Sequence, residues 1–236
     1  MIPADVKERT ACLLAEYLCY SINPQRFVEW AVYLLKQGIE TDDILILAGL
    51  DHYPREEIEA YFWRCVDDLK LKPEKSDTAL IQDLAMHIAG KVVADKLNPS
   101  EGLKKMVSLT INLDYPVNLE QFYTLDEDIS YLDYYDTTRI NDFNQTTDLN
   151  GVIRHEFELF LRAEKLNLAD KYREYAYCLN CKSLNAPALR PKRNWFGKVK
   201  YKYWACPGCG SSRIKHFESQ QGRDLILTAL EKRNAS

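Results

Sequence analysis

Four of the seven cysteines form two Cys-x-x-Cys pairs in the C-terminal part of the chain. Cys178 and Cys181 make the first pair, Cys206 and Cys209 make the second, and 24 residues separate the pairs. Each pair places two thiolates on one tight turn, and four thiolates complete the tetrahedral shell of a closed structural zinc site. The spacing therefore predicts one structural Zn²⁺ ion bound by these four residues. Iron in the same shell and redox use of the thiols are the alternatives.

The residues around the cysteines favour short hairpins. Basic and apolar residues alternate along Lys198–Trp204 and again along Arg213–Phe217, which is typical of strands. Gly208 and Gly210 permit the positive φ angles that turn backbone N–H groups toward sulfur, whereas Lys182 stands in the first turn where glycine would be easier. We expect the second turn to be the better formed of the two.

The run Cys206-Pro-Gly-Cys-Gly210 resembles the second knuckle of the four-cysteine zinc-ribbon family. The resemblance covers only residues 176–218, and it implies a three-stranded module that folds around zinc. Zinc ribbons occur in transcription factors, ribosomal proteins, enzymes and adaptors. The resemblance therefore implies a fold for this segment and does not select a function.

Charge is divided unevenly along the chain. The net charge is −4, yet residues 1–177 contain 19 Lys or Arg against 32 Asp or Glu, while residues 178–217 contain nine Lys or Arg and no acid. Cations interleaved with flat rings are the combination with which proteins bind single-stranded nucleic acid. The candidate contact residues are Arg190, Lys192, Arg193, Trp195, Lys198, Lys200, Tyr201, Lys202 and Tyr203.

This basic surface has two interpretations. We favour docking on an acidic protein surface, either that of this chain or that of a partner subunit, because an acidic helical body repels a polyanion. Binding of nucleic acid is the alternative, and it predicts an affinity that falls as salt is added.

A second charged segment lies at 126–136 and contains five acids and three tyrosines. A surface of this composition is suited to binding a basic partner, or to imitating nucleic acid in the cleft of a basic enzyme. An immunity or inhibitor protein is therefore a further hypothesis. Its candidate interface residues are Asp126, Glu127, Asp128, Asp133 and Asp136.

Apolar residues recur at helical spacing over most of the first 112 residues and again over 152–175. The span 114–150 is rich in Asp, Asn, Tyr and Thr, and we expect loops and at most one short helix there. The predicted fold is mainly α. It has a multi-helix domain over 1–175, a small β zinc ribbon over 176–218, and a C-terminal helix over 219–236. The predicted helices in the first part are 6–20, 24–37, 42–48, 54–69, 76–97 and 99–109.

One helical segment has a resemblance of its own. Trp30 precedes the run Thr41–Leu50, which ends in Leu-Ala-Gly-Leu, and Glu59–Phe62 follows it. This arrangement resembles a recurring segment of bacterial helical proteins of unknown function, and it implies no activity. Physically, the small residues of the run allow two helices to cross closely at a turn.

Catalytic motifs are lacking. The chain has no Gly-rich phosphate loop and no Gly-x-Ser-x-Gly elbow. His155 and Glu156 begin the pattern of a zinc peptidase, but Leu159 stands where the second histidine belongs, and we interpret the pair as part of a solvated helix face. An active site assembled from distant helices would leave no local pattern.

We therefore expect a non-enzymatic adaptor or regulatory subunit that binds a protein partner in a bacterial complex. An accessory factor for nucleic acid is the alternative. The sequence has no apolar run of about 18 residues and no signal-peptide core, so we expect a cytoplasmic protein without a membrane partner. The sequence predicts no oligomeric state.

Overall fold

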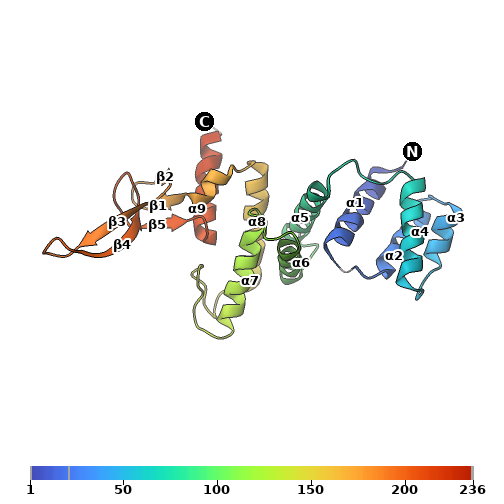
Figure 1. Ribbon diagram of the computed structural model, residues 1–236, viewed down its shortest axis with the longest axis horizontal. Helices are drawn as coiled ribbons and strands as arrows, with labels where there is room; N and C mark the ends of the chain where they lie inside the picture. Colours follow the sequence, from blue (N-terminus) through green and yellow to red (C-terminus); the bar gives the residue numbers. More distant parts are fainter. Residues whose placement is uncertain (1, 21, 235–236) are drawn as a thin grey trace. The chain divides into compact units, whose positions relative to one another are not determined.

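The computed structural model describes residues 2–20 and 22–234, and the chain forms two compact units. The first unit spans residues 1–87 and 111–114, and the second spans 88–110 and 115–236. The described residues contain nine α-helices, one 3-10 helix and five short strands (Figure 1). The predicted mainly-α fold with a small C-terminal β region that carries the four cysteines is therefore confirmed.

The first unit is built from four helices and the start of a fifth. They are α1 (Ala4–Cys19), α2 (Gln25–Lys36), α3 (Asp42–Ala48), α4 (Arg55–Asp68) and α5 (Asp77–Val93). These bounds agree closely with the predicted helices, because caps and apolar spacing both mark them in the sequence.

The core of the first unit is aromatic. The ring centroids of Phe27 and Phe62 lie 4.2 Å apart, and those of Trp30 and Phe62 lie 5.1 Å apart. The Trp30 indole N–H donates to the Thr10 hydroxyl at 3.0 Å, and that hydroxyl donates to the Val6 carbonyl at 2.8 Å. The indole N–H and the Thr10 hydroxyl inside this core are therefore both paired.

The second unit continues with α6 (Pro99–Asn112), α7 (Glu120–Leu132), α8 (Leu149–Lys165), a 3-10 helix η1 (Asp170–Glu174) and α9 (Gln220–Asn234). Helix α7 has 13 residues and lies in the span 114–150, where the sequence predicts loops and at most one short helix.

Helix α7 forms because it has an apolar face that packs on α8. The Phe122 ring lies 4.8 Å from the ring of Phe157 and 5.5 Å from that of Phe160. Leu125 and Leu132 are buried on the same helix. The acidic and tyrosine-rich residues between these positions conceal the helical spacing in the sequence.

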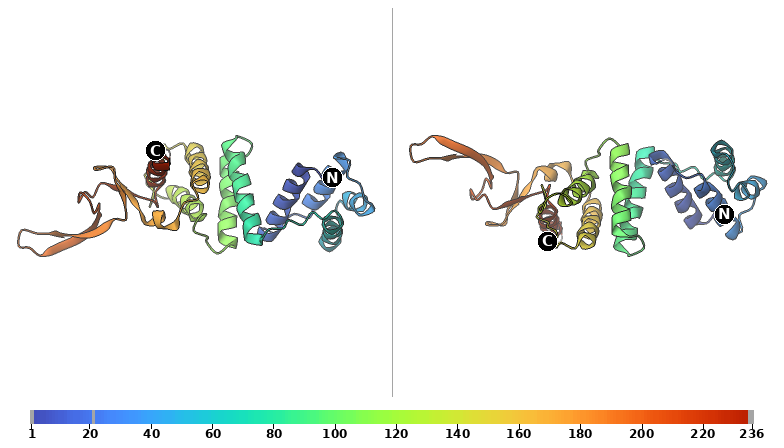
Figure 2. Two further views of the ribbon diagram at one scale, coloured as in Figure 1. Left: turned by 90° about the horizontal axis from the view of Figure 1, so that it is seen from above. Right: turned by 90° about the horizontal axis from the view of Figure 1, so that it is seen from below.

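Five strands follow α8 and η1, in two antiparallel sheets. Strands β1 (Ala176–Cys178), β2 (Leu184–Asn185) and β5 (Ile214–His216) form a three-stranded sheet in the order β2-β1-β5. Strands β3 (Ala188–Arg193) and β4 (Val199–Ala205) form a separate hairpin. Both views in Figure 2 show this hairpin extending away from the helices of the second unit.

Helix α9 covers the three-stranded sheet. Leu184 and Phe217 pack with Ile226 and Leu230 of the helix in one apolar cluster. At Gly222 the helix approaches the chain so closely that a Cβ atom would lie 1.7 Å from the His216 carbonyl oxygen. The end of β5 is thereby fixed against the first turn of α9.

In the part of the chain that the structure describes, no helix is long and apolar enough to cross a membrane.

Candidate metal centre and basic hairpin

The four predicted ligands meet at one point. The sulfur atoms of Cys178 and Cys209 lie 3.6 Å apart, as do those of Cys181 and Cys206. All four sulfur atoms lie within 4.8 Å of one another. A tetrahedral shell with Zn–S bonds of about 2.3 Å requires S–S separations of about 3.8 Å. The cluster therefore has the size of a shell that binds one metal ion.

Both knuckles use the same backbone hydrogen bonds. The Cys178 N–H donates to the Ser183 carbonyl at 2.9 Å, and the Cys206 N–H donates to the Ser211 carbonyl at 2.9 Å. Cys178 ends β1 and Cys206 directly follows β4. One ligand in each pair is thus positioned by a strand, and the other by the turn that follows.

The residue after each pair closes the knuckle in a left-handed conformation. The Lys182 N–H donates to the Cys178 carbonyl and the Gly210 N–H donates to the Cys206 carbonyl, both at 2.9 Å. Lys182 has a φ of 61° and Gly210 a φ of 75°. The first turn therefore has the same shape as the second, but a lysine adopts the strained angle there.

Hydroxyl and amide groups surround the sulfur atoms. The Ser183 hydroxyl lies 3.0 Å from the sulfur of Cys181 and 3.4 Å from that of Cys206. The Asn180 amide donates to the sulfur of Cys209 at 3.7 Å. The Ser183 hydroxyl and the Cys209 N–H lower the pKa of Cys206 to about 6. These groups favour the thiolate, which is the form that binds metal.

The pKa values of Cys209 and Cys178 are shifted in opposite directions. The Ser211 N–H and the Asn180 amide lower the pKa of Cys209. The Cys181 N–H lowers the pKa of Cys178, but burial and the neighbouring sulfur atoms outweigh it and raise that pKa to about 11. A buried thiol of this kind loses its proton when a cation takes the proton's place.

The hairpin places most of the predicted contact residues on two strands that lack a covering layer. Its register pairs Arg190 with Tyr203 and Lys192 with Tyr201 across the strands, so these four side chains share one face. The Lys192 ammonium lies 5.9 Å from the centroid of the Tyr201 ring. On this face each cation of β3 therefore lies opposite a tyrosine ring of β4.

The opposite face carries a further ring. Trp204 pairs with Leu189, and Lys202 pairs with Pro191. Trp204 is 51% exposed, and it was not among the predicted contact residues. The period of two along Lys198–Trp204 is the signal that could have identified it.

The tip of the hairpin is the most exposed aromatic element in the described chain. Trp195 is 98% exposed and Phe196 is 84% exposed. The turn is closed by Gly197 at a φ of 74°, and the Arg193 guanidinium donates to the Gly197 carbonyl at 2.8 Å. Lys198 directly precedes β4, and Lys200 lies at the exposed start of that strand.

Arg190 connects the hairpin to the metal site. Its guanidinium donates to the Pro207 carbonyl at 3.0 Å. The same guanidinium lies 3.5 Å from where a Cβ atom of Gly210 would be. Arg190 is therefore an anchor of the hairpin on the second knuckle as well as a candidate contact residue.

The hairpin does not dock on acidic residues of the described chain. None of its six cations forms an ion pair with a described acid. Lys215 of β5, which lies outside the hairpin, pairs with Asp142 at 3.1 Å. Docking on an acidic partner subunit and binding of nucleic acid both stay predictions.

Asp128 does not belong to an exposed acidic interface, so its assignment there is wrong. It is 1% exposed, and one of its oxygens accepts the N–H groups of Arg139 and Ile140 at 2.9 and 3.2 Å. The other oxygen accepts the N–H of Asn141 at 2.9 Å. Asp128 shapes the loop after α7, because it satisfies three backbone donors there.

The other four acids of this segment lie nearer the surface. Asp126 is half-buried, and Glu127, Asp133 and Asp136 are exposed. Tyr134, beside them, is 83% exposed. The inhibitor hypothesis stays a prediction that now involves these four acids.

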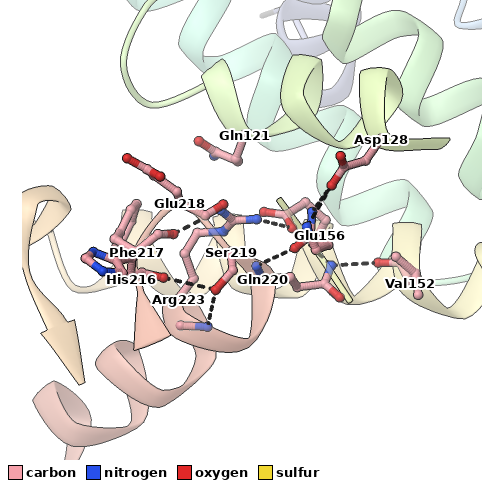
Figure 3. Close-up of polar contacts among 12 residues, drawn as sticks. Gln121, Asp128, Val152, Glu156, His216, Phe217, Glu218, Ser219, Gln220 and Arg223 are labelled. Atoms are coloured by element: carbon pink, nitrogen blue, oxygen red, sulfur yellow. Dashed lines mark hydrogen bonds and ion pairs between the residues drawn. The ribbon is translucent and has the colours of Figure 1, made fainter. Parts of the chain in front are cut away.

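Glu156 is buried, so its interpretation as part of a solvated helix face is wrong. One carboxylate oxygen accepts from the Arg223 guanidinium at 2.6 Å and from the Gln220 amide at 3.0 Å. The Gln220 N–H donates to the Asn141 side chain at 2.8 Å, and the Asn141 amide donates to Asp128 at 2.8 Å. This network joins α7, α8 and α9 (Figure 3).

No model of a known protein family matches the chain, and neither a curated protein nor a solved structure does.

Proposed function

We propose that the chain is a non-enzymatic binding protein whose zinc-held hairpin contacts single-stranded nucleic acid. The observation that carries this proposal is the register of β3 and β4, which pairs Arg190 with Tyr203 and Lys192 with Tyr201 on a face without a covering layer. A groove or ribbon of cations supplies contacts to phosphate, and exposed rings supply stacking surfaces for bases.

We propose zinc as the metal because four thiolates in a closed tetrahedral shell suit it, and because metal binding would stabilise the hairpin, which has no apolar core of its own. The hydroxyl and amide groups around the sulfur atoms support this assignment, since they stabilise ligating thiolates. The zinc site in this proposal is structural. It holds the two strands of the hairpin in place through Arg190 and Cys206.

Single-stranded nucleic acid is favoured over an acidic protein by the exposed rings. An acidic protein partner would account for the six cations of residues 188–205. It would not require Trp195 and Phe196 at the tip, nor two tyrosines opposite the cations on one face. Stacking of a base on such a ring contributes about 1–3 kcal/mol.

The test is a fluorescence-anisotropy titration of the zinc-loaded chain with a labelled single strand of about 12 nucleotides. We expect the logarithm of the binding constant to fall with the logarithm of salt with a slope of about −2 to −4, since each neutralised phosphate contributes about −0.7.

Two variants separate the roles of charge and stacking. Lys192→Ala should reduce that slope by about 0.7, whereas the exposed control Lys91→Ala should not. Tyr201→Ala should weaken binding by about 1–3 kcal/mol at unchanged slope, whereas the exposed control Tyr134→Ala should leave binding unchanged.

The proposal is wrong if the single strand does not bind at low salt. It is also wrong if an acidic peptide such as polyglutamate binds through the hairpin while the oligonucleotide does not, because the ligand is then an acidic protein surface.

A further inference from the structure

The hairpin of β3 and β4 has a second face, which a single strand bound beside the two tyrosines of β4 would not use. On this second face Trp204 lies opposite Leu189, and Lys202 lies opposite Pro191. Successive side chains of a strand point to opposite faces, so these four residues face away from the tyrosines. Trp204 is 51% exposed and Leu189 is 48% exposed. The second face therefore offers a ring and a cation of its own.

Neither face of the hairpin has a cover. Every residue of β3 after Ala188 is exposed, and every residue of β4 from Val199 to Trp204 is exposed except the half-buried Tyr203. The hairpin extends away from the helices of the second unit in both views of Figure 2. As far as the described part of the chain is concerned, a ligand can therefore occupy both faces at the same time.

The tip that joins the two strands is a closed turn with two exposed rings. The Asn194 N–H donates to the Lys198 carbonyl at 2.8 Å, and the Lys198 N–H donates to the Asn194 side chain at 2.9 Å. Trp195 and Phe196 lie within this turn and are almost fully exposed. An exposed ring on a turn held by hydrogen bonds is a surface on which a flat base can stack.

The six cations of the hairpin are spread over both faces and the tip. Arg190 and Lys192 lie on the face of the two tyrosines. Lys202 lies on the second face, and the other three cations surround the tip. A single strand on one face would leave most of these charges without a phosphate. A ligand that reaches both faces and the tip would neutralise all of them.

The two ends of the hairpin differ in what lies beyond them. At one end Arg190 donates to the Pro207 carbonyl at 3.0 Å, and Cys206 of the metal centre directly follows β4. At the other end the tip carries the exposed rings. Two strands that run along the two faces therefore converge beyond the tip.

We propose that the hairpin binds a forked nucleic acid, in which a duplex opens into two single strands. One strand lies on the face of Tyr201 and Tyr203, and the other lies on the face of Trp204. Trp195 stacks on the last base pair of the duplex, and the cations around the tip contact the phosphates beside it. This inference rests on the proposed binding of a single strand, to which it adds a second strand and a duplex end.

The experiment is an anisotropy titration of the full zinc-loaded chain with labelled DNAs that share one duplex. The fork has two unpaired arms of about 12 nucleotides each, and the one-armed duplex has a single arm of twice that length. These two probes have the same number of unpaired nucleotides. We expect the fork to bind at least about fivefold more tightly, because it engages a ring of the second face as well. A blunt duplex should bind more weakly than either. The same fork made of RNA is titrated in parallel, and the tighter fork identifies the backbone.

Two variants at exposed positions locate the fork. Lys202→Ala should reduce the salt slope of fork binding by about 0.7 and leave the slope for an isolated single strand unchanged. Trp195→Ser should weaken fork binding at least about fivefold and leave binding of the isolated strand unchanged. The exposed control Tyr134→Ala should alter neither.

The proposal is overturned, and the proposed function is not, if the single strand binds but the fork binds no more tightly than the one-armed duplex. It is also overturned if the blunt duplex binds as tightly as the fork, or if both Lys202→Ala and Trp195→Ser leave fork binding unchanged. If neither the single strand nor any other probe binds, the proposed function fails with it.

Discussion

The two small sheets of the second unit are made from neighbouring segments and yet are stabilised differently. The sheet of β2, β1 and β5 lies under α9, with Leu184 and Phe217 in an apolar cluster. The hairpin of β3 and β4 has no covering layer, and Trp195 at its tip is 98% exposed. An isolated two-stranded hairpin is at best marginally stable in water. The four-cysteine cluster lies where the two sheets meet, and our proposal is that a metal ion bound there holds the hairpin in place.

The largest expected effect follows from removing the metal. Cys206→Ser deletes one of four ligands and the residue that directly follows β4. We expect loss of bound zinc and loss of dispersed amide signals for residues 176–218 in a ¹⁵N-correlated NMR spectrum, because the binding free energy of zinc is folding free energy in such modules. Signals of the first unit should stay in place.

Cys12→Ala is the matched control, since Cys12 is a cysteine of the first unit outside the metal cluster. It should retain one zinc ion per chain. A Cys206→Ser protein with an unchanged spectrum over 176–218 would show that the apolar cluster alone keeps these residues folded. The hairpin would then not depend on the metal, and the contrast between the two sheets would be wrong.

The next effect concerns the cover of the three-stranded sheet. A Cβ atom added at Gly222 would lie 1.7 Å from the His216 carbonyl oxygen, so Gly222→Ala must move α9 away from β5. We expect a loss of about 1–3 kcal/mol or more in the free energy of unfolding by urea.

Gly90→Ala provides the contrast, because a Cβ atom there meets no atom within 4 Å. A gain of about 0.5–1 kcal/mol is expected at this exposed helical position. Equal effects of the two substitutions would show that α9 does not press on the sheet.

A smaller effect distinguishes the two knuckles. Lys182 and Gly210 occupy equivalent positions at φ angles of 61° and 75°, and a left-handed angle costs a residue with a side chain about 1–2 kcal/mol. Gly210→Ala should weaken zinc binding by that amount in a competition titration. Lys182→Gly should strengthen it by up to about 1 kcal/mol, after the entropy cost of glycine is subtracted. The reverse signs would show that the two turns differ in shape.

The smallest effect is expected at the tip of the hairpin. Trp195→Ser should change the free energy of unfolding by no more than about 0.5 kcal/mol, since an exposed side chain has few contacts to lose. Trp30→Phe, in the core of the first unit, should lower the unfolding free energy clearly because it leaves the Thr10 hydroxyl without its donor. A destabilised Trp195→Ser protein would mean that the tip packs on something in solution.

The sequence predicts most of the helices and all four clustered cysteines, because these features are local. The cap at Thr41 is an example: its hydroxyl accepts the Ile44 N–H at 3.3 Å, three residues away. The spacing within each Cys-x-x-Cys pair places its two thiolates on one turn. The resemblance to the zinc-ribbon family implies that both pairs bind the same ion.

Features that depend on distant partners could not be predicted in this way. Glu156 and Arg223 are 67 residues apart. The sequence around neither residue indicates that the two form a buried ion pair. Asp128 stands among surface acids in the sequence, yet it is buried because the loop at Arg139–Asn141 brings three N–H groups to it. Burial of a charged side chain is decided by tertiary contacts, which a single sequence does not state.

X-ray absorption at the zinc K-edge of the purified chain tests the central claim most directly, because the metal centre is the element on which the hairpin depends. We expect one zinc ion per chain with four sulfur neighbours at about 2.3 Å. Nitrogen or oxygen atoms in the shell, or a metal-free chain with its cysteines joined in disulfides, would contradict it.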